Sequence, residues 1–217
     1  VRTAERPIVT GAISAVYALL GGLLQVVAGT LLLFFMVNPL TSYLAFLAAF
    51  IYVVVYTPLK RISWVNTFIG AVAGALPPLG GWAARTGSLS LEAWLIFTLL
   101  YIWQMPHFFS IAWLYRDDYR RASLKMLPAI EEEPIWTKRI ISIFLGLLIL
   151  TSLFPVLRGV SGYIYLLTAL IAGGIFLYAG AVFYYRTTKR SAIMLKNASL
   201  LYLPLILIGT FLDNLFG

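Results

Sequence analysis

Seven long apolar stretches, separated by short charged loops, constrain the fold of this chain more than any other feature. A helix that crosses a bilayer needs about 20 mostly apolar residues. The stretches are continuous, whereas strands of a membrane β-barrel alternate between apolar and polar residues. We therefore predict an all-α integral membrane protein with transmembrane helices near residues 12–37, 40–57, 66–84, 91–114, 140–157, 162–185 and 197–213.

The composition agrees with membrane insertion and excludes several classes of function. Hydrophobic residues make up 61% of the 217 and charged residues only 11%, whereas soluble domains carry about 25% charged residues. Cysteine is absent, which excludes disulfides, zinc–thiolate sites and cysteine nucleophiles. The net charge of +8 comes from cations in short loops, which points to lipid headgroups or an anionic substrate rather than to nucleic acid.

The distribution of the cations predicts the orientation of the chain. If residue 1 is cytoplasmic, fourteen Lys and Arg residues lie in cytoplasmic segments and two, Arg85 and Arg158, lie outside, which accounts for all 16. Cytoplasmic loops are enriched in Lys and Arg. We expect a cytoplasmic N-terminus, an external C-terminus, and the loops 56–61 and 115–139 together on the cytoplasmic face.

The stretch 104–128 holds two adjacent aspartates, Asp117 and Asp118, among the cations Arg116, Arg120 and Arg121. Magnesium is typically held by one or two carboxylates together with substrate phosphates and waters. Neighbouring cations would stabilise the charge on a departing diphosphate. A surface salt-bridge cluster explains the same residues, because Arg121 lies three and four positions from the two aspartates. Both interpretations remain open.

The only histidine, His107, follows Pro106 within the fourth apolar stretch. Ionisable residues inside a membrane are rare and usually face the interior of the bundle. One interpretation is a hydrogen bond to a neighbouring helix. The others are a ligand to a haem iron, or a base that takes a proton from a cationic intermediate. Gln104 lies one turn away and would share the same cavity.

A second polar cluster comprises Tyr56, Lys60, Arg61 and Asn66, in and after the short loop. It is interpreted either as a cytoplasmic anchor with an interfacial tyrosine or as a site where Lys60 and Arg61 capture phosphate. The aromatic residues of the apolar stretches could also shield an allylic carbocation through cation–π attraction.

Six strings in the first 128 residues form a specific combination. They are R-T-A-E-R-P-I-V-T-G at 2–11, Y-T-P-L-K-R at 56–61, N-T-F-I-G at 66–70, G-A-L-P-P-L-G-G-W at 74–82, W-Q-M-P-H-F-F at 103–109 and A-W-L-Y-R-D-D-Y-R-R-A-S-L-K-M-L-P at 112–128. Together they resemble the UbiA superfamily of intramembrane prenyltransferases. The Pro-His-Phe and Arg-Asp-Asp-Tyr strings point to its haem-modifying branch, and beyond residue 140 only hydropathy supports the match.

The resemblance implies a UbiA-type bundle of nine spans around a lipid-accessible cavity, with residues 1–217 forming a single membrane domain. It implies that Mg²⁺ binds the diphosphate of farnesyl diphosphate, that the farnesyl cation is captured by a vinyl group of haem B, and that water completes haem O. Implied partners are the lipid bilayer and haem A synthase or cytochrome oxidase assembly. The implied residues are Asp117 and Asp118 for the metal, Lys60, Arg61, Arg116 and Arg120 for phosphate, His107 for haem, and Tyr56, Asn66, Gln104 and Arg121 as further substrate contacts.

The sequence departs from the pattern of this superfamily in two ways. A first aspartate-rich motif and two further spans are absent, so we expect residues 1–217 to be a fragment that is inactive alone. In addition, Arg121 stands where a D-x-x-x-D motif would place its second carboxylate, which leaves the number of metals open.

Two alternatives to this function remain. One is another UbiA-type transferase that acts on an aromatic acid or quinone precursor. The other is a transporter or non-catalytic assembly factor, although transporters usually place a polar site near the midplane between inverted repeats. We expect a bacterial or archaeal cell membrane, or the mitochondrial inner membrane in a eukaryote.

Overall fold

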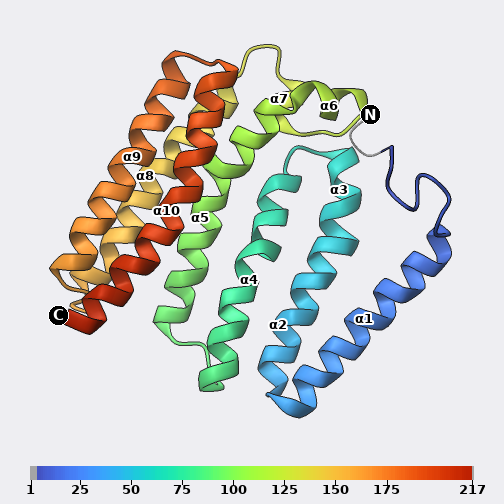
Figure 1. The fold of residues 1–217 in the computed structure, drawn as a ribbon, viewed down its shortest axis with the longest axis horizontal. Coiled ribbons are helices and arrows are strands. Elements are labelled where there is room, and N and C mark those ends of the chain that lie inside the picture. The colour runs from blue at the N-terminus through green and yellow to red at the C-terminus, as the bar shows by residue number, and fades with distance from the viewer. Residues whose placement is uncertain (1–3, 217) are drawn as a thin grey trace.

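The computed structural model describes residues 4–216 and shows helices and short loops, with no strand among those residues (Figure 1). Seven helical rods are long and apolar enough to cross a membrane. They are α1 (Ala15–Met36), the rod formed by α2 (Pro39–Phe50), η1 (Ile51–Tyr56) and α3 (Thr57–Ile62), α4 (Asn66–Thr86), α5 (Leu91–Leu114), α8 (Ile135–Leu157), α9 (Tyr163–Tyr185) and α10 (Lys189–Phe216). The predicted all-α fold class with seven spans is confirmed, and the chain is an integral multi-pass membrane protein.

Several spans extend further than hydropathy predicts. Helix α8 begins at Ile135 rather than near 140, and α10 begins at Lys189 rather than near 197. The start of α8 is stabilised by Glu131, whose carboxylate accepts hydrogen bonds from the backbone N–H groups of Trp136 (2.8 Å) and Thr137 (3.2 Å). Hydropathy therefore marks the apolar part of each span, whereas capping decides where the helix begins.

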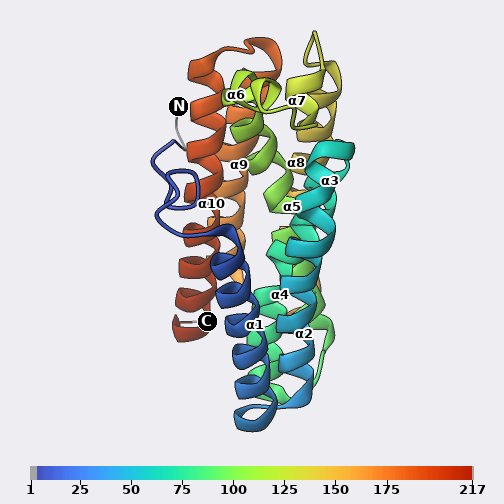
Figure 2. The same ribbon diagram turned by 90° about the vertical axis from the view of Figure 1, so that its right-hand side faces the viewer.

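The helices form two parts that differ in packing. Helices α5, α8, α9 and α10, here called the platform, share a large apolar core that includes the fully buried Phe109, Phe176 and Tyr202. Helix α1, the α2–α3 rod and α4, here called the wing, share a smaller core with part of α5. Helix α1 packs against α2 and has no buried residue. Figure 2 views the molecule from the side of the wing.

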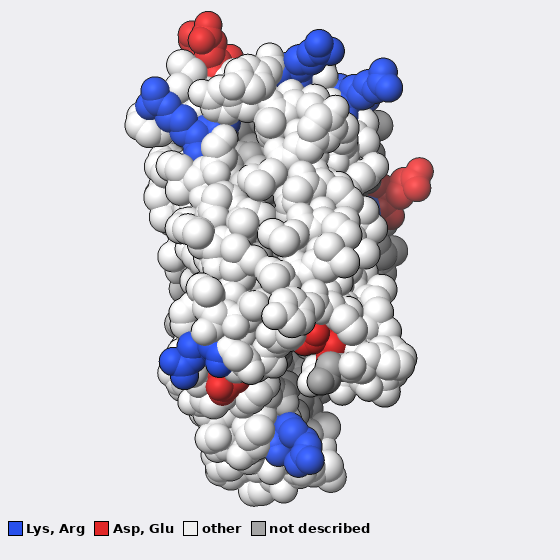
Figure 3. All heavy atoms as spheres, turned by 90° about the vertical axis from the view of Figure 1, so that its left-hand side faces the viewer, with Lys and Arg blue, Asp and Glu red and all other residues white. Residues whose placement is uncertain are grey.

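The loop 115–139 folds into two short helices, α6 (Arg116–Arg121) and α7 (Leu127–Ile130). Both lie at the same end of the bundle as α3, at the top of Figure 1. We call this the α6 end. On the face shown in Figure 3, charged side chains gather toward the two ends and leave a broad band of uncharged atoms between them. This pattern is what a bilayer requires of a spanning bundle.

The α2–α3 rod contains a π-helical segment, η1, whereas its neighbours α1 and α4 in the wing are α-helices. The N–H of Thr57 donates to the carbonyl of Tyr52, five residues back. The following residue, Pro58, has no N–H and its ring crowds the carbonyl four residues back, which favours the wider turn. Single π-helical turns frequently occur at functional sites, and this one carries Tyr52 and Tyr56 toward a cavity.

Candidate functional site

A cavity of about 570 Å³ lies between the α2–α3 rod, α4 and α5. We call it the wing cavity. Its lining is mostly apolar and consists of Ala48, Ala49, Tyr52, Val53, Tyr56, Thr67, Gly70, Ala73, Gly74, Gln104, Phe108, Ile111, Tyr119 and Met126. Pockets of roughly 300–1,000 Å³ with apolar walls and a few polar groups are typical of small-molecule sites. The sequence-predicted residues that reach it are Tyr56 and Gln104.

Two glycines of α4 shape the wall of the wing cavity. A Cβ atom at Gly70 would lie 2.7 Å from Cε2 of Tyr56, and a Cβ at Gly74 would overlap the amide oxygen of Gln104. The Gln104 amide lies against this glycine surface and donates hydrogen bonds to the carbonyls of Ala71 (3.2 Å) and Leu100 (3.1 Å). The absence of side chains at the two glycines therefore sets the positions of the only two predicted residues in the cavity.

Aromatic rings and one cation meet at the α6 end of the wing cavity. Nζ of Lys60 lies 4.1 Å from the centre of the Tyr56 ring and 5.7 Å from that of Tyr52. The two tyrosine rings are 5.3 Å apart. An ammonium group over aromatic faces is attracted by the ring quadrupoles, so Lys60 is held beside the cavity. Arg61, the next residue on α3, is exposed.

The two loops predicted to share a face are joined directly. The N–H of Lys125 donates to the carbonyl of Lys60 at 2.6 Å. The fully buried Asn66 donates from its amide nitrogen to the carbonyls of Ser63 (2.7 Å) and Lys125 (3.0 Å). Both hydrogen bonds from the amide nitrogen of Asn66 go to backbone carbonyls, so this side chain fastens the two loops together.

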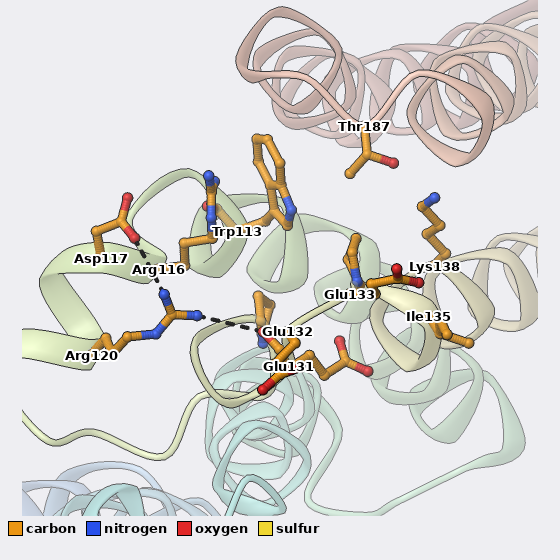
Figure 4. A pocket seen from close by; sticks show the side chains of 12 residues that line it. Trp113, Arg116, Asp117, Arg120, Glu131, Glu132, Glu133, Ile135, Lys138 and Thr187 are labelled. Atoms are coloured by element: carbon orange, nitrogen blue, oxygen red, sulfur yellow. Dashed lines mark hydrogen bonds and ion pairs between the residues drawn. The ribbon is translucent and has the colours of Figure 1, made fainter.

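A second cavity of about 410 Å³, here called the polar cavity, lies on the other side of α6 (Figure 4). Its lining includes Trp113, Arg116, Asp117, Arg120, Glu131, Glu132, Glu133, Lys138 and Thr187. In Figure 4 these side chains converge from the α5–α6 junction, the α7–α8 linker, α8 and the turn before α10. The polar residues of α6 are thus divided between two cavities, because Tyr119 of the same helix lines the wing cavity.

The two predicted metal ligands lie on different faces of α6. Asp117 lines the polar cavity and pairs with Arg120 at 3.7 Å, and its side chain is 69% exposed. Asp118 lines neither cavity, forms an ion pair with Arg121, and is 51% exposed. The salt bridges that the sequence offered as an alternative are therefore present. Both carboxylates remain accessible enough to exchange an arginine for another cation.

The donor set determines what kind of metal these aspartates could hold. Within residues 4–216, no group of three or more His, Cys, Asp or Glu side chains is placed to bind a metal. A site made only of protein ligands is therefore absent from that part of the chain. Magnesium does not need one, because it keeps waters and substrate phosphate oxygens beside one or two carboxylates. The aspartates fit a metal that arrives with a diphosphate.

The arginines around the aspartates have structural contacts of their own. Arg120 donates from Nε to the carbonyl of Ala129 (2.9 Å) and from Nη2 to that of Glu131 (3.5 Å). It therefore braces α6 against α7 and the start of α8. The guanidinium of Arg116 lies 4.2 Å from the Trp113 ring and donates to the Trp113 carbonyl at 3.0 Å. Arg116 keeps the remaining donors of its guanidinium fork available to an anion.

The structure places His107 against α10. Its Nδ1 lies 2.7 Å from the hydroxyl of Ser199, and its ring stacks on Trp103 with centres 4.9 Å apart. The hydrogen bond to a neighbouring helix, one of the three sequence-based interpretations, is therefore present. His107 is not among the residues that line the wing cavity, although Gln104 and Phe108 of the same helix are.

Several residues of the site escaped the sequence analysis. They are Tyr52, Gly70, Gly74, Trp113, Tyr119, Glu131 and Lys138. Tyr119 sits within the aspartate-rich string, and its position next to Asp118 was a usable signal. The importance of the two glycines was not readable from the sequence, since it depends on the approach of Tyr56 and Gln104 from other helices.

The comparisons with known proteins define the protein family to which this chain belongs. Residues 1–203 match the UbiA prenyltransferase family. The chain belongs to this family, which confirms the resemblance and the prediction of a prenyltransferase.

Similar sequences carry one recurrent name. "Protoheme IX farnesyltransferase" of Solibacter usitatus is 44% identical over 206 residues, covering 94% of this chain and 70% of the relative. Proteins of the same name from Koribacter versatilis and Opitutus terrae are 40% and 39% identical, cover 98% and 99% of this chain, and are matched over 71% and 73% of their own lengths.

Solved structures share the fold. A digeranylgeranylglyceryl phosphate synthase structure aligns with a TM-score of 0.81 at 16% identity, over 98% of this chain and 75% of that chain. A UbiA homologue from Aeropyrum pernix aligns with a TM-score of 0.69 at 19% identity, over 98% of this chain and 78% of its own. The UbiA-type arrangement of helices is therefore confirmed, whereas the roles of individual site residues stay predictions.

Proposed function

We propose that this prenyltransferase joins a farnesyl group to a vinyl group of haem B and so produces haem O. The relatives at 39–44% identity, all named protoheme IX farnesyltransferase, carry this assignment. The wing cavity supports it, because an apolar space bordered by Lys60 and α6 suits a molecule with a hydrocarbon chain and an anionic head.

In this proposal the farnesyl chain occupies the wing cavity with its diphosphate at the α6 end. Lys60, Arg61 and Arg116 neutralise phosphate charge. Arg120 and Arg121 form ion pairs with Asp117 and Asp118, and these pairs would open when the aspartates bind a metal. Asp117 and Asp118, which lie on different faces of α6 outside the wing cavity, would hold Mg²⁺ beside the diphosphate, and the metal would stabilise the departing group. Preorganised positive charge at the leaving group lowers the barrier to ionisation.

The aromatic residues of the cavity have a separate role. Ionisation breaks the bond between the farnesyl C1 and the diphosphate oxygen and leaves an allylic cation. The rings of Tyr52, Tyr56 and Phe108 line the cavity and would stabilise this cation through their faces. The vinyl group of haem B then forms the new carbon–carbon bond, and water adds to the resulting cation with loss of a proton.

We further propose that the α6 end faces the cytoplasm, in the cell membrane of a bacterium or archaeon. Fourteen of the 16 Lys and Arg residues lie in segments assigned to that end. Haem A synthase or the assembly machinery of cytochrome oxidase would receive the product. A cysteine placed at position 123, in the α6–α7 loop, and another at position 87 would test the orientation through labelling from the two sides of the membrane.

The decisive experiment measures haem O by mass spectrometry in membranes that contain the protein, supplied with haem B, farnesyl diphosphate and Mg²⁺. Asp118→Ala should lower the rate by about 100-fold or more, since it removes charge stabilisation from the leaving group. Arg190→Ala, at the start of α10 rather than on α6, is the charged control and should retain activity. An Asp118→Ala variant as fast as the parent would remove this residue from the mechanism. A parallel reaction would contain 4-hydroxybenzoate as the acceptor. A prenylated 4-hydroxybenzoate product, with no haem O from haem B, would assign the protein to the transferases that act on aromatic acids.

A further inference from the structure

We propose that Gln104 closes the far end of the wing cavity and sets the longest isoprenoid chain that this site accepts. The inference rests on the proposed function, because it places the farnesyl chain in the wing cavity. It deepens that function by assigning the residue that distinguishes a chain of three isoprene units from a chain of four. The depth of the cavity, the packing beyond it and the contacts of Gln104 carry the argument.

The wing cavity has a limited depth along the helices that border it. Its lining residues fall within 48–56 of the α2–α3 rod, 67–74 of α4 and 104–111 of α5. The rod and α5 run toward the α6 end and α4 runs away from it (Figure 1), so Ala48, Gly74 and Gln104 are the lining residues of these helices farthest from α6. The lining of α4 and that of α5 each cover seven residue steps, which correspond to about 10 Å. Tyr119 and Met126 continue the lining at the α6 end.

The length of an extended isoprenoid chain can be compared with this depth. An extended chain advances by about 3.3–3.6 Å over three bonds, as a protein backbone does. Farnesyl has eleven bonds along its main chain and therefore reaches about 12–13 Å, and a fourth isoprene unit adds four bonds, or about 4–5 Å. A depth of about 10 Å along the helices, together with the space at the α6 end, accommodates three units. A fourth unit would extend beyond Gln104.

The helices are closely packed beyond this end of the cavity. Leu44 of the rod, Leu79 of α4 and Ala93 of α5 belong to the core of the wing, and each is 5% exposed or less. Each lies farther from α6 along its helix than any lining residue of that helix. Phe97 of α5 packs against the same core. A chain that passed Gln104 would therefore meet closely packed side chains rather than continuous space.

The side chain of Gln104 crosses from α5 to α4 at the closed end. Its amide nitrogen donates to the carbonyls of Ala71 on α4 and Leu100 on α5, and the residue is 4% exposed. Its amide oxygen occupies the volume that a Cβ atom at Gly74 would need. A longer chain would have to displace this amide and leave its N–H groups without partners in an apolar cavity, which is costly. Gln104 therefore holds a fixed position at the end of the cavity.

Three substitutions separate the volume of this side chain from its polarity. Gln104→Ala extends the cavity toward the core of the wing, so it should accept a fourth isoprene unit. Gln104→Leu fills most of the same volume without forming hydrogen bonds, so it should still reject that unit. Ala48→Leu shortens the cavity from the opposite wall and should favour the two-unit geranyl chain. Gln25→Ala is the matched control, because it removes the only other glutamine of the chain from an exposed position on α1.

The test offers geranyl, farnesyl and geranylgeranyl diphosphate in competition to the full-length protein in nanodiscs, with haem B and Mg²⁺, and measures the products by mass spectrometry. The parent should prefer farnesyl to geranylgeranyl by at least tenfold in kcat/KM, since even one methylene group in an apolar pocket changes this ratio by about 10–200-fold. Gln104→Ala should raise the ratio of geranylgeranyl to farnesyl product by tenfold or more. Gln104→Leu and Gln25→Ala should retain the parental ratio.

A binding measurement distinguishes failure of this inference from failure of the proposed function. Unreactive thiodiphosphate analogues of the three chains are titrated against the same variants, and their affinities should follow the same order without turnover. If the parent makes no haem O but this order holds, the proposed acceptor is wrong and the chain-length assignment stands. If the parent makes haem O yet uses farnesyl and geranylgeranyl equally well, the inference is wrong while the function stands.

The variants provide further ways to overturn the inference. An unchanged product ratio in Gln104→Ala, with a melting temperature that shows it to be folded, would mean that another residue limits the chain. A ratio that rises as much in Gln104→Leu as in Gln104→Ala would reject the role of side-chain volume. If Gln104→Ala does not fold, Ala48→Leu decides, and the absence of a shift toward geranyl diphosphate would contradict a closed end at this depth.

Discussion

The platform and the wing of this bundle have similarly apolar sequences but differ in packing, because the platform forms a dense core and the wing borders a cavity. The platform packs large side chains such as Phe109, Phe176 and Tyr202 into a core without exposure. The wing places small residues, among them Gly70 and Gly74, around a cavity. Helix α5 belongs to the platform and yet forms one wall of the cavity. The difference shows how the closely packed α5 places Gln104 on one wall of the wing cavity while small residues of α4 keep the opposite wall open.

The largest expected effect is on the packing of the platform. Phe176→Ala should destabilise the fold by about 3–5 kcal/mol, because it removes a fully buried ring and leaves a hole. Phe35→Ala, on α1 where the side chain is 78% exposed, should change stability by less than about 0.5 kcal/mol. Unfolding in mixed micelles would measure both. Equal losses would mean that the platform and the wing are packed alike.

The next effect concerns the glycine wall of the wing. Gly74→Ala should push the Gln104 amide away, cost about 1–3 kcal/mol through overpacking, and lower the rate of prenyl transfer. Gly81→Ala is the control on the same helix, since a Cβ there would meet nothing within 4 Å. It should be neutral or slightly stabilising. Thermal denaturation and haem O formation would be measured for both variants.

A third test separates stability from function within the platform. Asp213 accepts hydrogen bonds from the N–H groups of Gly162, Ile164 and Tyr165 at the start of α9, at the end of the bundle opposite α6 (Figure 1). Asp213→Ala leaves these donors without their partner, so the melting temperature should fall by several degrees. Asn214→Ala, at the exposed neighbouring position, should have little effect. Turnover per folded molecule should be the same in both.

The smallest effects separate two neighbouring arginines of α6. Arg121, 76% exposed and paired only with Asp118 in the ion pairs of the described residues, should contribute less than about 1 kcal/mol, as exposed pairs do. Arg120 also donates to two carbonyls beyond α6, so Arg120→Ala should cost more than Arg121→Ala. Chemical denaturation would rank them. The reverse order would show that Arg120 does not brace the loop.

Much of the fold could be predicted from the sequence. The seven spans follow from hydropathy, and their limits differ mainly where polar residues such as Lys138 and Lys189 continue a helix beyond its apolar part. The six strings identified the family because their order and spacing are specific. The π-helical turn before Pro58 was not predicted, since a proline tells where regular hydrogen bonding fails but not which register replaces it.

The site was predicted less completely than the fold. The sequence indicated that Lys60 and the aspartate string share one end, and the bond between Lys125 and Lys60 brings their loops together. It did not indicate that Asp117 and Tyr119 line different cavities. That division depends on the rotation of α6, a helix of six residues whose position is set by contacts with α5 and α7 rather than by its own pattern.

The sequence by itself determined that this chain spans a membrane seven times, that its loops 56–61 and 115–139 meet at one end, and that it is a UbiA-type prenyltransferase. Hydropathy, charge and short motifs are properties of local sequence, so they needed no coordinates. Only the tertiary structure decided the partner of each polar side chain. His107 meets Ser199 across 92 positions, because packing of α5 against α10 brings them together, and no local pattern encodes that meeting.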